Sequence, residues 1–133
     1  MAKRFTHTQC FAHFGTVPRN VQWSWSARNE ETGAVAVTLW RDEFKRAGEG
    51  LLYERGPLDP DARVRPGHTE LMGNLRWALD NADGRVRVIV AVAEDAAAKP
   101  RKIADCAPTE MLAYVRTLDE ATGAFSIEAK LKA

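Results

Sequence analysis

The sequence predicts a single α+β domain over residues 1–133, with a mostly antiparallel, strongly bent sheet or small β-barrel of about seven strands and two helices packed on it. Three observations predict this fold. Most of the ordered-looking segments alternate apolar and polar residues with a period of two, which is typical of strands. Two pairs of these segments are joined by short loops that end in glycine, as in β-hairpins. Helical patterns do not alternate regularly with the strands, which disfavours a doubly wound parallel sheet.

The first third of the chain predicts a short helix followed by a hairpin. A helix is expected over residues 7–14, because Thr6 and Gln9 have the spacing of a capping box and Gly15 can end the helix. The alternation in residues 23–27 predicts a strand with both of its tryptophans on one face, and a second strand is expected over residues 34–40. The loop between them ends in glycine and suits a hairpin turn.

The remaining elements follow from the same two periodicities. Residues 41–67 are rich in glycine and proline, so we expect a long irregular connection with one short strand over 51–54. An apolar arc at helical spacing predicts a helix over 68–81, with Trp77 on the opposite side. Further strands are expected over residues 85–93, 100–106, 111–118 and 124–130, and the last two form a second hairpin.

Composition excludes several classes of protein. The chain is 45% hydrophobic and 28% charged, as a globular protein is, and it has no apolar run long enough to span a bilayer. Its 19 Lys and Arg against 18 Asp and Glu give a charge of +1, which excludes a histone-like protein. Thirteen of these cations are arginine, which suits contacts to phosphate and to planar rings. With two cysteines and no secretory leader, we expect a cytoplasmic protein that does not bind a membrane.

The sequence contains no recognisable catalytic or cofactor motif. His7, Cys10, His13 and Cys106 could be four zinc ligands by count, but no C-x-x-C pair is present and a helix packed on the sheet explains the first three. There is neither a nucleophile elbow nor a phosphate-binding glycine loop. We therefore predict no catalytic residue, no metal and no cofactor. His68 is the one histidine at a loop-to-helix position and is a candidate acid or base.

The tryptophans are the strongest candidates for a binding site. Three of the four fall in the first predicted hairpin, beside arginine and polar residues. Aromatic faces next to such groups predict a pocket for a planar base, whereas packing in the core is the alternative. Trp77 is expected either to contact a partner or to be covered by the 41–67 segment. The candidate ligand-binding residues are Trp23, Trp25, Trp40, Asn20, Asp42, Arg19, Arg28, Arg41, His68 and Trp77.

Several segments resemble a family of small bacterial proteins. They are residues 14–16, 20–27, 39–44, 74–78 and 100–103. The same segments resemble the modified-DNA-reading modules that precede HNH nucleases in restriction enzymes, which are similar in kind to the PUA-like group of SRA, EVE, ASCH and YTH domains. The resemblance implies a compact PUA-like barrel that flips a modified base into an aromatic cage, in a defence context. This chain departs from the pattern because it has no HNH segment.

Together these observations predict a noncatalytic nucleic-acid-binding module, with modified DNA as the expected partner. In this hypothesis the hairpin tryptophans stack on a base, Asn20 and Asp42 bind its edge, and Arg19, Arg28 and Arg41 contact the backbone. One alternative is a small nucleotide-processing enzyme that uses His68 or Asp42 as acid or base. The other is a homodimeric interaction protein that uses Trp77 and an edge strand.

Overall fold

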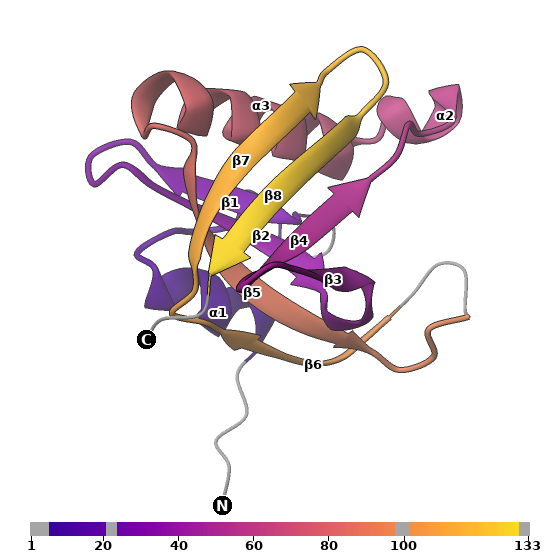
Figure 1. Ribbon diagram of the computed structural model, residues 1–133. Helices are drawn as coiled ribbons and strands as arrows, with labels where there is room; N and C mark the ends of the chain where they lie inside the picture. The colour runs from indigo at the N-terminus through magenta and orange to yellow at the C-terminus, as the bar shows by residue number, and fades with distance from the viewer. Residues whose placement is uncertain (1–5, 21–23, 98–101, 131–133) are drawn as a thin grey trace, which may run out of the picture.

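The computed structural model describes residues 6–20, 24–97 and 102–130, and Figure 1 shows a bent sheet with helices on both of its faces. None of the described helices is long and apolar enough to cross a bilayer, since the longest has 16 residues. In chain order the elements are α1 (His7–His13), β1 (Ser26–Asn29), β2 (Ala34–Trp40), a 3-10 turn (Arg41–Glu43), β3 (Phe44–Ala47), β4 (Gly50–Arg55), α2 (Pro60–Arg63), α3 (Pro66–Asn81), β5 (Arg85–Ala93), β6 (Ile103–Pro108), β7 (Leu112–Asp119) and β8 (Ala124–Lys130).

The eight strands form one sheet in the order β1-β2-β5-β7-β8-β4-β3, with β6 paired to the second half of β5. This confirms the predicted bent α+β sheet, although the barrel alternative is wrong because β1 and β3 end the described order without pairing to each other. All neighbours are antiparallel except β2 and β5, which are parallel. A parallel pair needs a long crossover, and here the chain from Arg41 to Gly84 provides it.

The locally encoded elements form as the sequence predicts, except that the strand expected over residues 23–27 is present as β1 at Ser26–Asn29. Thr6 and Gln9 make both hydrogen bonds of the capping box at the start of α1. The loops before β2 and β8 use the same chemistry, because Asn29 and Asp119 each accept backbone N–H groups through Oδ1. Each loop then ends at a glycine with positive φ, Gly33 or Gly123.

The 41–67 segment contains more structure than the sequence predicts. The short strand expected over 51–54 is present as the longer β4, and it pairs with β3 as well as with β8. β3 lacks an apolar alternation because it lies at the edge of the sheet, where Lys45, Arg46 and Ala47 are exposed. The single turn of α2 was not predicted, so the structure has three helices instead of two. The strand expected over 100–106 begins at Ile103, and its first residues lie outside the described ranges.

Two apolar clusters lie on opposite faces of the sheet. The larger cluster packs α3, through Leu71, Leu75 and Ala78, into the concave face formed mainly by β2, β5, β7 and β8. The smaller cluster packs α1, through Cys10 and Phe11, onto the outer face of β2 and β5. Because β5 contributes alternate residues to both clusters, it is buried on both faces along part of its length.

The fully buried Leu75 tests the packing of α3. Leu75→Ala should lower the free energy of unfolding by about 2–5 kcal/mol, because the cavity it leaves cannot collapse completely. Chemical denaturation followed by circular dichroism would measure this loss. Val64→Ala is the control, since Val64 is 78% exposed, and this substitution should change stability by less than about 0.5 kcal/mol. Similar small effects of both substitutions would contradict the proposed core.

Candidate functional site

The predicted site residues do not lie together in the structure. Trp25 and Trp40 form an aromatic contact, with ring centroids 5.4 Å apart, and the ring of His7 lies 6.1 Å from that of Trp25. His7 also shares a 2.6 Å hydrogen bond with Thr38, and burial lowers its pKa. Both tryptophans are half-buried beside α1, while Trp23 lies outside the described residues. His7 of α1, Trp25 and Trp40 therefore pack together between α1 and the outer face of β2.

Arg41 and Asp42 follow Trp40 directly, in the 3-10 turn. With Val92 and two alanines they line a cavity of about 270 Å³. Asn20 does not line this cavity, and its backbone forms two hydrogen bonds with Ser24. The predicted edge-binding residues, Asn20 and Asp42, thus lie at separate places.

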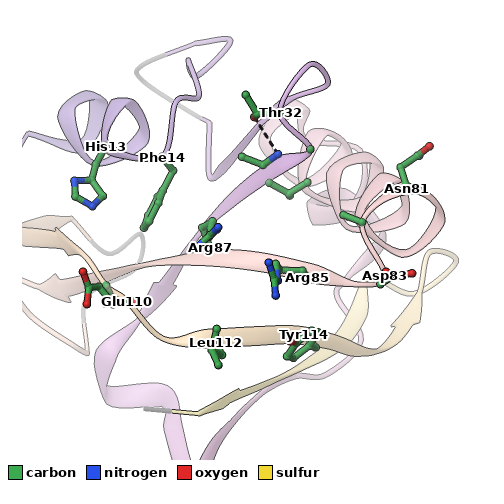
Figure 2. A pocket seen from close by; sticks show the side chains of 15 residues that line it. His13, Phe14, Thr32, Asn81, Asp83, Arg85, Arg87, Glu110, Leu112 and Tyr114 are labelled. Carbon is green, nitrogen blue, oxygen red and sulfur yellow. Dashed lines mark hydrogen bonds between the residues drawn. The ribbon is translucent and has the colours of Figure 1, made fainter. Parts of the chain in front are cut away.

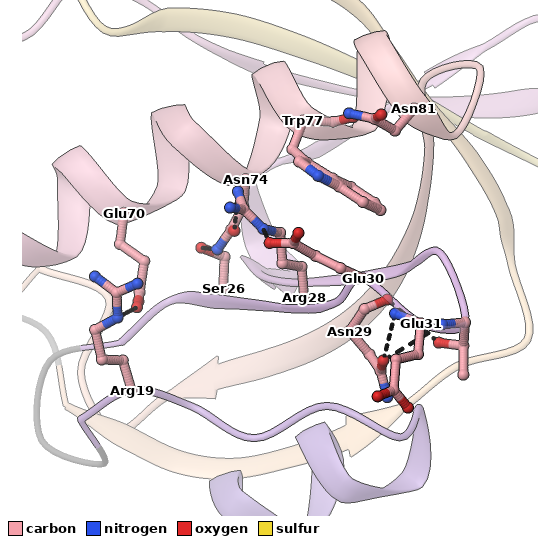
Figure 3. Close-up of polar contacts among 11 residues, drawn as sticks. Arg19, Ser26, Arg28, Asn29, Glu30, Glu31, Glu70, Asn74, Trp77 and Asn81 are labelled. Atoms are coloured by element: carbon pink, nitrogen blue, oxygen red, sulfur yellow. Dashed lines mark hydrogen bonds and ion pairs between the residues drawn. The ribbon is translucent and has the colours of Figure 1, made fainter.

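Arg19, Arg28 and Trp77 lie on the α3 side of the sheet. The guanidinium carbon of Arg28 is 5.5 Å from the ring centroid of Trp77, a cation–π contact between β1 and α3. Trp77 also packs against the larger apolar cluster. Figure 3 shows Trp77 beside Arg28 and Glu30. Arg28 of β1 therefore covers one face of Trp77, a contact that neither prediction for this residue included.

His68 belongs to a buried polar cluster at the other end of α3. Arg55 lies with Nη2 2.9 Å from Nδ1 of His68, and it donates two hydrogen bonds to the carbonyl oxygen of Gly123. A side chain at position 123 would meet His68, because an added Cβ would lie 2.7 Å from its Cε1. Burial lowers the pKa of His68, and the charges of Arg55 and Arg63 lower it further. This histidine joins α3 to β4 and to the β7–β8 loop.

The two cysteines lie next to each other in the interior of the protein. Cys10 and Cys106 are buried, unbridged, and have their sulfur atoms 3.4 Å apart. Burial raises the pKa of Cys10 to about 12, so its thiol stays protonated near neutral pH. Among the described residues no three potential metal ligands come together. The four residues that could be zinc ligands by count are thus not gathered around one point.

A different surface has the properties expected of a binding site. The outer face of the sheet is hollowed beside the end of α1, where a groove of about 920 Å³ lies over β5 and β7 (Figure 2). α1 covers Ile89 and Ala91 on this face of β5, but it does not reach the first half of the strand. His13 and Phe14 form one wall of the groove, and their rings meet edge to face at 5.0 Å.

Cationic and aromatic side chains lie side by side in this groove. Arg85 and Arg87 project from β5 on the outer face, because Val86 and Val88 alternate with them into the core. Arg85 is directly opposite Tyr114 of β7, so their Cβ atoms are separated by only about 5 Å. Tyr114 is 38% exposed and Leu112 is 43% exposed.

The lining of the groove holds two cations, Arg85 and Arg87, and two anions, Asp83 and Glu110. Asp83 and Glu110 lie on its rim, and Arg116 of β7 is paired with Glu128. Within the described ranges, Arg85 and Arg87 form no ion pair. The sequence carried a signal for this surface, since arginine alternates with valine in β5 and Leu112, Tyr114 and Arg116 alternate in β7. The valines and the tryptophans were expected to be the important residues, so the opposite face of β5 and β7 was not predicted as a binding surface.

Comparison of the chain with family models, with curated proteins and with solved structures gives no match. The resemblance to PUA-like modules therefore stays a prediction.

The low pKa of His68 predicts a loss of stability in acid. Below the ordinary value of 6.5 the unfolded chain binds a proton at His68 that the folded protein resists, so stability should fall as the pH falls through this value. Thermal unfolding at about pH 7.5 and about pH 5.5 would measure this difference. His68→Gln keeps a hydrogen-bond acceptor for Arg55 and should make the difference smaller.

The control for this experiment is a substitution that destabilises the core without changing a titratable group. Ile127 is fully buried, and Ile127→Val should lower the melting temperature at both pH values by a similar amount. An unchanged pH dependence in His68→Gln would show that His68 does not couple folding to protonation.

Proposed function

We propose that this chain is a noncatalytic module that binds single-stranded nucleic acid across the outer face of β5 and β7. The observation that carries the proposal is the position of Arg85 and Arg87, which form no ion pair with a described residue, beside the exposed ring of Tyr114 in an open groove. Cations beside exposed aromatic side chains in an open groove are an arrangement by which proteins bind single strands without a deep pocket.

Arginines on one strand suit a phosphate backbone. Arg85 and Arg87 are two residues apart, so their side chains leave the same face at positions separated by about 7 Å. This is close to the spacing of successive phosphates in an extended strand, and each guanidinium can donate two hydrogen bonds to one phosphate. Lys130, which is opposite Leu112 on β8, adds a third cation to this face.

The aromatic side chains favour a single strand over a duplex. Tyr114 is exposed on the sheet, and Phe14 lines the wall of the same groove. A ring can stack on a base only where a face of that base is free, and in a duplex the neighbouring base pairs cover both faces. Tyr114 would therefore bind an unpaired base, in RNA or in DNA.

The proposed partner, a nucleic acid, is the one that the sequence predicts, but the contact surface is a different one. Trp25 and Trp40 lie against α1 and do not belong to the lining of the groove. Recognition of a modified base by the hairpin tryptophans stays a separate prediction, which comparison of modified and plain oligonucleotides would test.

The first experiment removes the two cations. Arg85→Gln/Arg87→Gln should weaken binding to a labelled single strand of about twelve nucleotides, measured by fluorescence anisotropy. It should also reduce the slope of log affinity against log salt by about 1.4, since each contact between a cation and a phosphate of a single strand contributes about 0.7.

The matched control removes two exposed cations elsewhere. Lys45→Gln/Arg46→Gln lies on the edge strand β3, away from the groove, and causes the same loss of charge. It should leave the affinity close to that of the wild type. Equal affinities of the two double variants, or no binding of any single strand by the wild type at low salt, would overturn the proposal.

The second experiment removes the ring. Tyr114→Ala should weaken binding about 5- to 150-fold, the loss expected for one stacked base. The salt dependence should stay unchanged, because no charge is removed. Tyr114→Phe keeps the stacking surface and should bind like the wild type. If Tyr114→Ala binds as tightly as Tyr114→Phe, this ring does not contact a base.

A further inference from the structure

A second groove lies on the opposite side of the sheet, between α3 and β1. Its volume is about 540 Å³, which is the size of a site for a small molecule or for one side chain of a peptide. Figure 3 shows its polar residues, with Glu70 and Asn74 on α3 facing Arg19, Ser26 and Arg28. Gly73 lies between the two helical residues, and the space beside it is open.

Glu70 is the unusual residue of this groove. Its side chain is only 10% exposed, and Oε1 is buried without a hydrogen-bond partner among the described residues. Oε2 faces Nε of Arg19 at 3.8 Å, which is too long for a hydrogen bond. A buried carboxylate oxygen without a donor is costly, so this position is unfavourable for the protein alone.

Three other polar side chains of the groove, those of Arg28, Glu30 and Asn74, are already paired. Asn74 donates a hydrogen bond of 2.7 Å to Ser26, and Arg28 donates one of 2.9 Å to Glu30. Arg28 also lies over the ring of Trp77. The guanidinium of Arg28 therefore lies between a carboxylate and an aromatic ring. The groove has a second carboxylate, that of Glu70, and the cation beside it, Arg19, is too far away for a hydrogen bond.

We propose that Glu70 binds a guanidinium group from a ligand in this groove. A guanidinium is planar and can donate two parallel hydrogen bonds to both oxygens of one carboxylate, which would satisfy Oε1 and Oε2 together. Arg19 is the only cation paired with Glu70 among the described residues, and its side chain is 80% exposed. Such a pair contributes little to stability, so a ligand can displace Arg19 into solvent at small cost.

The guanidinium can come from a free small molecule or from the arginine side chain of a peptide. Calorimetric titration with agmatine and with the capped peptide acetyl-Gly-Arg-Gly-amide distinguishes these sources. Butylguanidinium and butylurea, which have similar shape and differ in charge, test the chemistry directly. We expect the guanidinium compounds to bind and butylurea not to bind.

Two variants give effects of opposite sign. Glu70→Gln should weaken binding of butylguanidinium about 10- to 150-fold, because it removes the charge that receives both hydrogen bonds. Arg19→Gln should tighten binding, because it removes the competing cation. A contact that served only the fold would not give this pair of opposite changes.

Controls separate loss of the site from loss of the fold. Without ligand, the melting temperature of Glu70→Gln should equal or exceed that of the wild type, since the variant removes a buried charge that has only one weak ion pair. Glu31→Gln removes a nearby exposed acid that does not line the groove and should bind like the wild type. Equal binding by Glu70→Gln and the wild type, or binding of butylurea as tight as that of butylguanidinium, would overturn the proposal. So would the absence of binding by every guanidinium probe.

Discussion

The fold depends on the pairing of β5 with three other strands. β5 lies parallel to β2 on one side, and on its other side it pairs first with β7 and then with β6. It therefore joins the β1–β2 hairpin to the part of the sheet formed by β7, β8, β4 and β3. Its inward residues, Val86 and Val88, meet α3, and two of its outward residues, Ile89 and Ala91, meet α1. The first proposed binding surface lies on the outer face of β5 and β7, and the second lies on the opposite face, between α3 and β1.

The large groove exists because α1 is too short to cover β5. Gly15 has φ +74° and ends the helix directly after Phe14, so the chain turns away before it reaches Arg85. A longer helix would need apolar partners at positions 85 and 87, and the sequence has arginine there instead. The end of α1 and the two arginines are thus consistent with each other. The helix does not cover positions 85 and 87, and arginine at these positions is suited to solvent or to a ligand.

Local patterns predicted most elements of the fold, whereas their long-range arrangement was not readable. The capping box of α1, the two hairpin loops and the alternation in β5 depend on neighbouring residues, and all of them are present. The parallel pairing of β2 with β5 depends on the whole crossover between them, and no local pattern encodes it. The same limit applies to the site. Trp25 and Trp40, which the sequence predicts to share a pocket, contact each other, whereas the groove over β5 and β7 is lined by residues that are distant in the sequence.

Uncompensated charges locate the two candidate sites better than the net charge does. The formal charge of +1 implies almost no long-range field. Among the described residues, however, the outer face has two arginines that form no ion pair, and the α3 face has a buried carboxylate oxygen without a donor. An exposed, unpaired arginine costs the fold little, because water solvates it. A buried carboxylate oxygen without a partner costs far more, because nothing replaces the water it has lost. Glu70 is therefore better suited to a specific ligand. Arg85 and Arg87 are suited to a weaker, salt-dependent attraction of a polyanion.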